Sequence, residues 1–332
     1  MLGLQNHLPV RAARVAALAV ALVATFADGA LRARAETART VKLVVPFPPG
    51  GGADTLARLV AEQVGRASGF RMVIENRPGA GTVIATEAVS RAEPDGNTIL
   101  LVANSFVINA SLKTLNYDPL TSFEPVCLLS RSPNVIAVNS ASPYRSLSDL
   151  IQAAHARPAE LTMAFQGPGT GQHVAFEKLK LAAHIEMIQV PFTGAAPAVS
   201  ALLGRHVTAL LANYPSAIEQ IKSGHLRALA FASATRTSSA PDIPTIAESS
   251  VAGYEEENVW FGIVVPAGTA QDKITQLASW LKAAMQAPEV EARTAALELY
   301  PTIVCGADFA SYLRRQRDEY QRVVREAKMK AE

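Results

Sequence analysis

The sequence predicts an α/β protein, because short apolar runs alternate with amphipathic stretches along most of the chain. From residue 41 onward, each β-branched run is followed by a glycine or proline turn and then by a segment with helical spacing. This order is typical of parallel βα units. No repeat of solenoid period and no low-complexity tract interrupts it.

Residues 1–35 stand apart from this pattern, because they have the composition of an export signal. Arg11 and Arg14 give a basic start, residues 15–26 form an apolar run of 12 residues, and Ala33-Arg34-Ala35 supplies small residues for cleavage. A membrane-spanning helix needs about 20 apolar residues. We therefore expect a cleaved signal peptide, with an anchoring helix as the alternative.

Charge and cysteine content exclude some classes of function. Without residues 1–35 the chain carries 27 basic and 28 acidic residues, so its net charge is −1 and nothing favours nucleic acid. Cys127 and Cys305 are the only cysteines. An oxidising compartment would allow them to pair, but we favour two buried thiols. Neither has a histidine or cysteine at metal-ligand spacing, so we assign no metal and no cofactor.

The expected elements fall into two sets with a closing segment. The first set has strands at residues 41–46, 71–75 and 98–103, with helices at 54–67 and 83–91. The second has helices at 147–155, 172–183, 195–203 and 214–223, with strands at 161–165, 188–190, 207–211 and 226–231. A loop at 235–248 leads to a strand at 259–265 and helices at 271–286 and 308–330.

The strands at 135–139 and 259–265 bound the middle of the chain, which suggests that the chain enters a second lobe and returns. Two such crossings form a two-strand hinge, and the cleft between two lobes can close around a ligand. We expect residues 36–137 to form the first part of lobe 1, residues 138–258 lobe 2, and residues 259–332 the return to lobe 1.

A glycine-rich loop at residues 46–54 joins a predicted strand to a predicted helix. A helix start offers unpaired N–H groups and partial positive charge, so it can hold a carboxylate or phosphate without a basic side chain. The alternative is a tight turn with Asp54 as the helix cap. The candidate ligand-binding residues in this loop are Phe47, Pro49, Gly50, Gly51 and Asp54.

A second loop of the same kind, at residues 167–173, opens a helix in the middle of the chain. Its candidates are Gly167, Gly169, Thr170, Gln172 and His173. If both loops face one cleft, a molecule with a carboxylate at each end would bridge them. His173 could donate to that ligand or pack on its own helix, and we favour packing. Neither loop has the complete P-loop or dinucleotide pattern.

Structural roles are expected for the acidic and aromatic residues outside the two loops. The acidic run 255–257 is expected to be a solvated face, and Trp260 and Phe261 are expected in the core in preference to the floor of the cleft. The sequence has no HExxH and no GxSxG motif, so no hydrolytic site is assigned.

A series of ordered motifs carries a resemblance to a known family. They include Val45-Pro46-Phe47-Pro48-Pro49-Gly50-Gly51-Gly52-Ala53-Asp54, Glu75-Asn76-Arg77-Pro78-Gly79-Ala80-Gly81, Gly169-Thr170-Gly171-Gln172-His173 and Pro241-Asp242-Ile243-Pro244-Thr245. The chain from Val41 to its end resembles the substrate-binding proteins of tripartite tricarboxylate transporters, also called the Bug family.

The resemblance implies a type II periplasmic-binding-protein fold with two α/β lobes, a two-strand hinge and a ligand cleft between them. It also implies a periplasmic monomer that is not an enzyme, captures a small organic carboxylate and delivers it to membrane transporter subunits. Phe47, Gly51 and Asp54 match the family's first loop, and Gly169 and Thr170 its second. The same correspondence adds Asn104, Ser105, Thr193 and Gly194 to the cleft.

Two departures from the family pattern bear on the ligand. Leu211-Ala212-Asn213 stands where members commonly have Phe-Asp-Asn, and Gly81-Thr82-Val83-Ile84 stands where they have Gly-Gly-Asn-Ile. Asn213 stays a candidate ligand residue. If Ala212 and Val83 face the site, they would favour a less charged or more aromatic ligand.

Two other functions stay open. A ligand sensor that docks on a signalling partner would keep the same cleft. An α/β enzyme would use the two loops as an anion site, and it would need His173 near Ser105 or Asp54.

Overall fold

The computed structural model describes residues 40–249 and 251–330, so the predicted export signal lies outside the described residues. The strands are β1 (Thr40–Val45), β2 (Arg71–Asn76), β3 (Thr98–Val102), β4 (Phe123–Asn139), β5 (Thr162–Phe165), β6 (Ile188–Pro191), β7 (Ala209–Asn213), β8 (Leu226–Phe231), β9 (Asn258–Pro266) and β10 (Tyr300–Cys305).

The helices alternate with these strands over most of the chain, as the sequence predicts. They are α2 (Gly52–Ser68), α3 (Val83–Ser90), α4 (Ser105–Leu112), α5 (Leu147–Ala156), α6 (Gly171–Ala183), α7 (Ala195–Leu203), α8 (Ile218–Lys222), α9 (Gln271–Met285), α10 (Pro288–Ala296) and α11 (Ala307–Glu326). Short 3₁₀ turns η1 (Ala80–Thr82), η2 (Tyr214–Ser216) and η3 (Ala247–Ser249) connect some of them.

The strands form two connected groups that share β4. In the first group the order is β2, β1, β3, β9 and β4, with β10 also paired to β4. In the second, β4 is followed by β7, β5 and β6, with β8 also paired to β4. We call the first group and its helices the first lobe, and the second group and its helices the second lobe.

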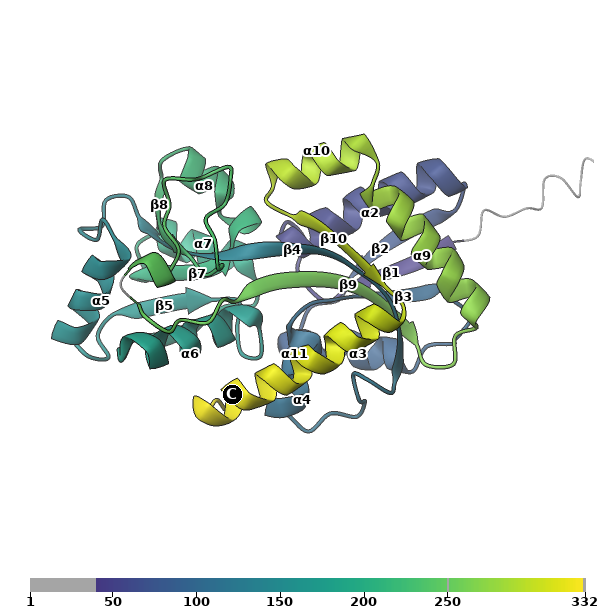
Figure 1. Ribbon diagram of the computed structural model, residues 1–332, viewed down its shortest axis with the longest axis horizontal. Coiled ribbons are helices and arrows are strands. Elements are labelled where there is room, and N and C mark those ends of the chain that lie inside the picture. The colour runs from purple at the N-terminus through teal and green to yellow at the C-terminus, as the bar shows by residue number, and fades with distance from the viewer. Residues whose placement is uncertain (1–39, 250, 331–332) are drawn as a thin grey trace, which may run out of the picture. The chain divides into compact units, whose positions relative to one another are not determined.

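Strand β4 passes from one group to the other. It pairs with β9 as far as Pro133 and Asn258, and with β7 from Asn134 and Asn213 onward. Figure 1 shows β4 and β9 side by side where the chain joins the two lobes. The lobe boundaries at residues 137 and 258 stay predictions.

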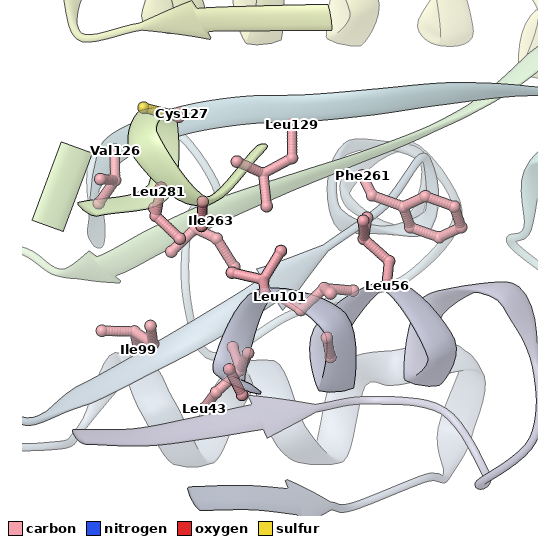
Figure 2. Packing of buried hydrophobic residues seen from close by; sticks show 14 of the residues in the cluster. Leu43, Leu56, Ile99, Leu101, Val126, Cys127, Leu129, Phe261, Ile263 and Leu281 are labelled. Carbon is pink, nitrogen blue, oxygen red and sulfur yellow. The ribbon is translucent and has the colours of Figure 1, made fainter. Parts of the chain in front are cut away.

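Each lobe has helices packed on both faces of its strands, because apolar residues lie on both sides of the central strands. In the first lobe, side chains of α2 and α9 pack on one face, as Figure 2 shows for Leu56 and Leu281 beside Leu101 and Ile263. Side chains of α3, α4 and α11 pack on the other face. In the second lobe, α5 and α6 cover one face, and α7 and α8 the other.

Cys127 and Cys305 form a disulfide, so the preference for two buried thiols was wrong. They are 178 residues apart in sequence but lie opposite each other on the antiparallel strands β4 and β10. Strand β10 was not predicted. Without it, nothing in the sequence indicated that the two side chains would meet.

The structure also contains elements that the sequence did not predict, namely α4, α10 and the first half of β4. The first half of β4 was missed because its register against β9 is irregular and two prolines lie within the strand, and both features obscure the alternating pattern. Among residues 40–249 and 251–330, no helix is both long enough and apolar enough to span a membrane.

Candidate functional site

A cavity lies between the two lobes, at the carboxyl ends of four strands that each lead into a helix. The connections are those from β1 to α2, from β3 to α4, from β5 to α6 and from β6 to α7. The space between atoms is about 560 Å³, including the part that opens to solvent. This volume is in the range of sites for small molecules.

Four helix N-termini therefore line one cavity. Their first residues Gly52, Ser105, Gly171 and Ala195 all belong to its wall. The N-cap residues of α2, α4 and α7 make no side-chain capping hydrogen bond. Unpaired N–H groups and the positive ends of the helix dipoles favour a negatively charged ligand at this point.

Among the residues that the structure describes, no ionisable side chain belongs to this wall. It consists of Phe47, Pro48, Pro49, Gly51, Gly52, Ala53, Ala103, Asn104, Ser105, Gln166, Thr170, Gly171, Gln172, Gly194, Ala195, Ala196, Asn213, Val259 and Phe261. An anion in this cavity would be held by backbone and side-chain dipoles, without an ion pair.

Asn213, at the end of β7, supplies a free donor. The residue is only 3% exposed, and its Oδ1 accepts a hydrogen bond of 2.7 Å from the Ser216 hydroxyl. This bond fixes the amide, and Nδ2 has no hydrogen-bond partner among the described residues. An unpaired buried donor costs about 1–3 kcal/mol, which a ligand acceptor would remove.

Two further polar side chains are held in the wall by neighbours. The Thr82 hydroxyl donates to Ser105 Oγ at 3.0 Å, which leaves the Ser105 hydrogen for another acceptor. Gln172 Nε2 donates to Asn134 Oδ1 at 2.9 Å, so β4 orients this side chain.

Glycines allow the close approaches across the cavity. A Cβ on Gly52 would lie 2.7 Å from Asn213 Nδ2, and one on Gly171 would lie 3.0 Å from Asn104 Cγ. A Cβ on Gly194 would lie 2.9 Å from Pro48. The helix starts of the two lobes can approach this closely only without side chains.

Most of the residues expected from the sequence meet in this cavity. They are Phe47, Pro49, Gly51, Asn104, Ser105, Thr170, Gln172, Gly194 and Asn213. Gly167 and Thr193 line an adjoining cavity, which shares Phe47, Pro48, Gln166 and Thr170 with the first. Gly50, Asp54, Gly169 and His173 belong to neither wall.

Asp54 supports the first loop from behind. Its carboxylate accepts hydrogen bonds from the Gly50 N–H at 3.0 Å, Arg58 Nε at 2.9 Å and Asn76 Nδ2 at 2.9 Å. Burial alone would raise the pKa of Asp54, but these bonds outweigh it and lower the pKa. The carboxylate therefore stabilises the loop that carries Gly51.

His173 packs beneath the second loop. Its ring stacks on Phe165 with 5.2 Å between centroids, and its Nδ1 accepts from the Gly169 N–H at 3.4 Å. Burial lowers its pKa to about 4. The neutral imidazole thus holds the loop from inside the second lobe.

Sequence reasoning missed several wall residues, among them Gln166, Ala195, Ala196 and Val259. Ala195 and Ala196 could have been inferred, because they follow the candidate residue Gly194 and begin the helix expected at residues 195–203. Phe261 serves both the first-lobe core and the wall, whereas Trp260 lies in the core.

The structure changes three other interpretations, those of Glu257, Ala212 and Val83. Glu257 is buried, so a solvated face was wrong for this member of the run 255–257, although Glu255 and Glu256 are exposed. Ala212 and Val83 pack in hydrophobic clusters and belong to neither cavity wall. They therefore give no direct reason for a less polar ligand.

Comparison with protein families and relatives gives a consistent result. The family model described as "Tripartite tricarboxylate transporter family receptor" matches residues 56–329. The chain is 34% identical over 300 residues to protein BugT of Bordetella pertussis, across 88% of this chain and 91% of that protein.

Solved structures agree with the fold. The structure of periplasmic binding protein BugD has a TM-score of 0.83 and 31% identity, covering 88% of this chain and 98% of BugD. An R. palustris protein solved with adipate has a TM-score of 0.84 and 31% identity, covering 88% of this chain and 98% of its own. The predicted periplasmic-binding-protein fold is confirmed.

Proposed function

Because the chain belongs to the tripartite tricarboxylate transporter receptor family, a family of periplasmic solute-binding proteins, we propose that it captures a small organic carboxylate between its two lobes. The observation that carries this proposal is the convergence of four helix N-termini, together with the unpaired Asn213 Nδ2, on one cavity. Adipate bound to the R. palustris relative supports the same ligand class.

The carboxylate would lie against the starts of α2, α4, α6 and α7. Backbone N–H groups, the Ser105 hydroxyl and Asn213 Nδ2 are the donors available to its oxygens. Such bonds to an ionised acceptor are stronger than those between neutral groups. Water molecules can complete the set.

The rest of the ligand would extend into the adjoining cavity. Its wall holds Pro46, Pro78, Pro168, Pro191 and Phe192 and, as in the first cavity, none of its described residues has an ionisable side chain. A second carboxylate would thus find no cationic side chain in the wall itself, and the Lys113 ammonium beside Gly81 donates to the carbonyl of Ala80 at 2.9 Å. An apolar body suits this wall better, so a ligand with one carboxylate and an aliphatic or aromatic body is favoured.

The family relation supports a wider role. We infer that the mature protein is a periplasmic monomer, exported through its N-terminal signal, that delivers its ligand to membrane transporter subunits without chemical change. A comparison of the chain length in the periplasm with that of the full precursor would test the cleavage step.

A thermal-shift screen tests the binding function. The panel would contain succinate, adipate, citrate, glutamate, hexanoate, benzoate and phenylacetate, because a ligand that binds only the folded state raises the melting temperature. At least one acid should raise the melting temperature. Hexanoate should raise it more than adipate, the dicarboxylate of equal chain length. A response to none of these acids would contradict capture of an organic acid, and turnover of an ester or phosphate would favour an enzyme instead.

A further inference from the structure

Glu257 is a buried acid that makes several hydrogen bonds at once. It directly precedes β9 and is 3% exposed. Its Oε1 accepts from the Tyr320 hydroxyl at 2.8 Å and from Asn104 Nδ2 at 3.0 Å, while Oε2 accepts from Lys178 Nζ at 2.7 Å. A carboxylate so deeply buried is stable as an anion only with such partners.

The partners come from both lobes. Lys178 lies on α6 of the second lobe, whereas Tyr320 lies on α11 and Asn104 at the start of α4 in the first. The Glu257 N–H donates to the carbonyl of Ala232 after β8 at 2.8 Å, which ties its backbone to the second lobe. The network therefore spans the junction of the lobes.

Asn104 connects this network to the ligand cavity. It lines the cavity at the N-cap of α4 but makes no capping bond, because its side chain is held elsewhere. Its Oδ1 accepts from the Trp260 N–H at 3.1 Å and its Nδ2 donates to Glu257. The same side chain lies beside the start of α6, because a Cβ added to its first residue, Gly171, would be 3.0 Å from Asn104 Cγ.

We propose that Glu257 and Lys178 are positioning residues for ligand capture, which hold Asn104 and the start of α6 in the arrangement that binds the carboxylate. This inference rests on the proposed function. Lys178 and Asn104 share one acceptor group, so the ion pair reaches the cavity through a single side chain.

The energetics of buried ion pairs support a role in geometry. Replacing such a pair with apolar residues of similar size is often neutral for stability, whereas removing one partner is strongly destabilising. The pair between Lys178 and Glu257 is therefore poorly explained by stability alone. The hydrogen bond that Glu257 accepts from Asn104 can instead orient this cavity residue.

Single substitutions of Glu257 and Lys178 test whether this ion pair affects ligand affinity. In Glu257→Gln a single amide oxygen replaces the two carboxylate oxygens that accept from Asn104, Tyr320 and Lys178, so Asn104 loses its charged acceptor. Its bonds to the Asn258 carbonyl, the Tyr320 hydroxyl and the Trp260 N–H remain, so we expect its amide to shift within the cavity wall. With adipate and benzoate as probes in calorimetric titration, Glu257→Gln and Lys178→Met should each bind at least tenfold more weakly. Glu255→Gln is the matched control, because Glu255 is exposed and paired with Arg322; its affinity should stay within twofold.

A double variant distinguishes positioning from a merely structural role. Lys178→Met combined with Glu257→Met should regain the stability lost in Lys178→Met, measured by urea unfolding, yet remain at least tenfold weaker in binding. Recovery of affinity together with stability would overturn the inference. Singles that bind as tightly as the unaltered chain would overturn it as well.

The failures of the two proposals can be told apart. If the unaltered chain binds no acid of the panel, both proposals are overturned. If it binds one of them and the variants at Lys178 and Glu257 bind it equally well, only the positioning role is lost.

Discussion

Gly52 lies so close to Asn213 that a Cβ on the glycine would be 2.7 Å from the amide nitrogen. The glycine opens α2 in the first lobe, and the asparagine ends β7 in the second. An unpaired donor and an uncapped helix start thus face the same small space. This relationship makes Asn213 the first residue to test.

Asn213→Asp should weaken carboxylate binding at least tenfold, about 1.4 kcal/mol. The change replaces a donor by a negative charge beside the anion site, with almost no change in size. Titration calorimetry at neutral pH measures the effect. Ser216→Ala is the control, because it removes only the hydroxyl that orients Asn213 and should cost less. Equal binding by Asn213→Asp would place the carboxylate elsewhere.

Gly171→Ala should reduce affinity while the protein stays folded. Its Cβ would lie 3.0 Å from Asn104 Cγ, so either Asn104 or the start of α6 must move. Gly65→Ala, inside α2 and 3.4 Å from its nearest neighbour atom, is the comparison. That substitution should leave binding unchanged and stabilise the helix by about 0.5–1 kcal/mol. Circular dichroism would confirm folding of both, and an unaltered affinity for Gly171→Ala would argue against contact at this helix start.

The affinity for carboxylates should depend only weakly on salt. No ionisable side chain from residues 40–249 or 251–330 lines the cavity, and interactions with buried dipoles are screened much less than exposed ion pairs. We expect less than a threefold change between about 10 mM and 500 mM sodium chloride, a range over which exposed charges are increasingly screened. A steep loss of affinity would instead indicate a cationic side chain at the bound carboxylate.

Loss of the disulfide should lower stability without changing ligand affinity. The bond between Cys127 and Cys305 closes a long segment of chain, and removing a native disulfide typically costs about 2–5 kcal/mol. Both residues lie outside the cavity wall. The double variant Cys127→Ala with Cys305→Ala should therefore melt at a lower temperature but bind normally; a melting temperature equal to that of the unaltered protein would contradict this expectation.

Stability should fall as the pH is lowered from about 6.5 to 4, in part because of His173. Burial lowers its pKa from 6.5 to about 4, so in this interval the unfolded chain binds a proton that the folded chain does not. The slope from this group is at most about 1.4 kcal/mol per pH unit. Glu177 faces the ring and acts in the opposite sense, because burial raises its pKa, and Lys180 lies beside both.

His173→Gln should flatten this pH dependence. Urea unfolding at several pH values between 4.5 and 7 gives the free energy of unfolding for both proteins. If the variant keeps the full slope, another group is responsible for the loss of stability in acid.

Much of the fold could be predicted because it follows from local patterns. Strand β3 has a continuous apolar run, β1 has a β-branched apolar run interrupted only by Lys42, and glycine loops mark the starts of α2 and α6. The first half of β4 escaped because its register shifts and prolines break the alternation. The pairing of Cys127 with Cys305 escaped because it depends on a contact between distant strands.

The part of the candidate site that could be predicted consists of the glycine-rich loops between strands and helices. Gly51 and Thr170 could be found from their position between strand and helix, but the sequence could not tell which loop residues face the cavity. Asp54 and His173 have the chemistry of ligand-binding groups, yet both turn away and support the loops. Burial of Glu257 could not be foreseen, because its partner Lys178 is 79 residues away.

A binding site built from the starts of helices has a consequence for how its specificity can change over time. Backbone N–H groups are present whatever the side chain, so substitutions around the cavity can alter which molecules fit without removing the attraction for a negative charge. Selection acting on residues such as Phe192 or Thr193 could redirect the protein to a new acid in small steps, with each intermediate still able to hold a carboxylate.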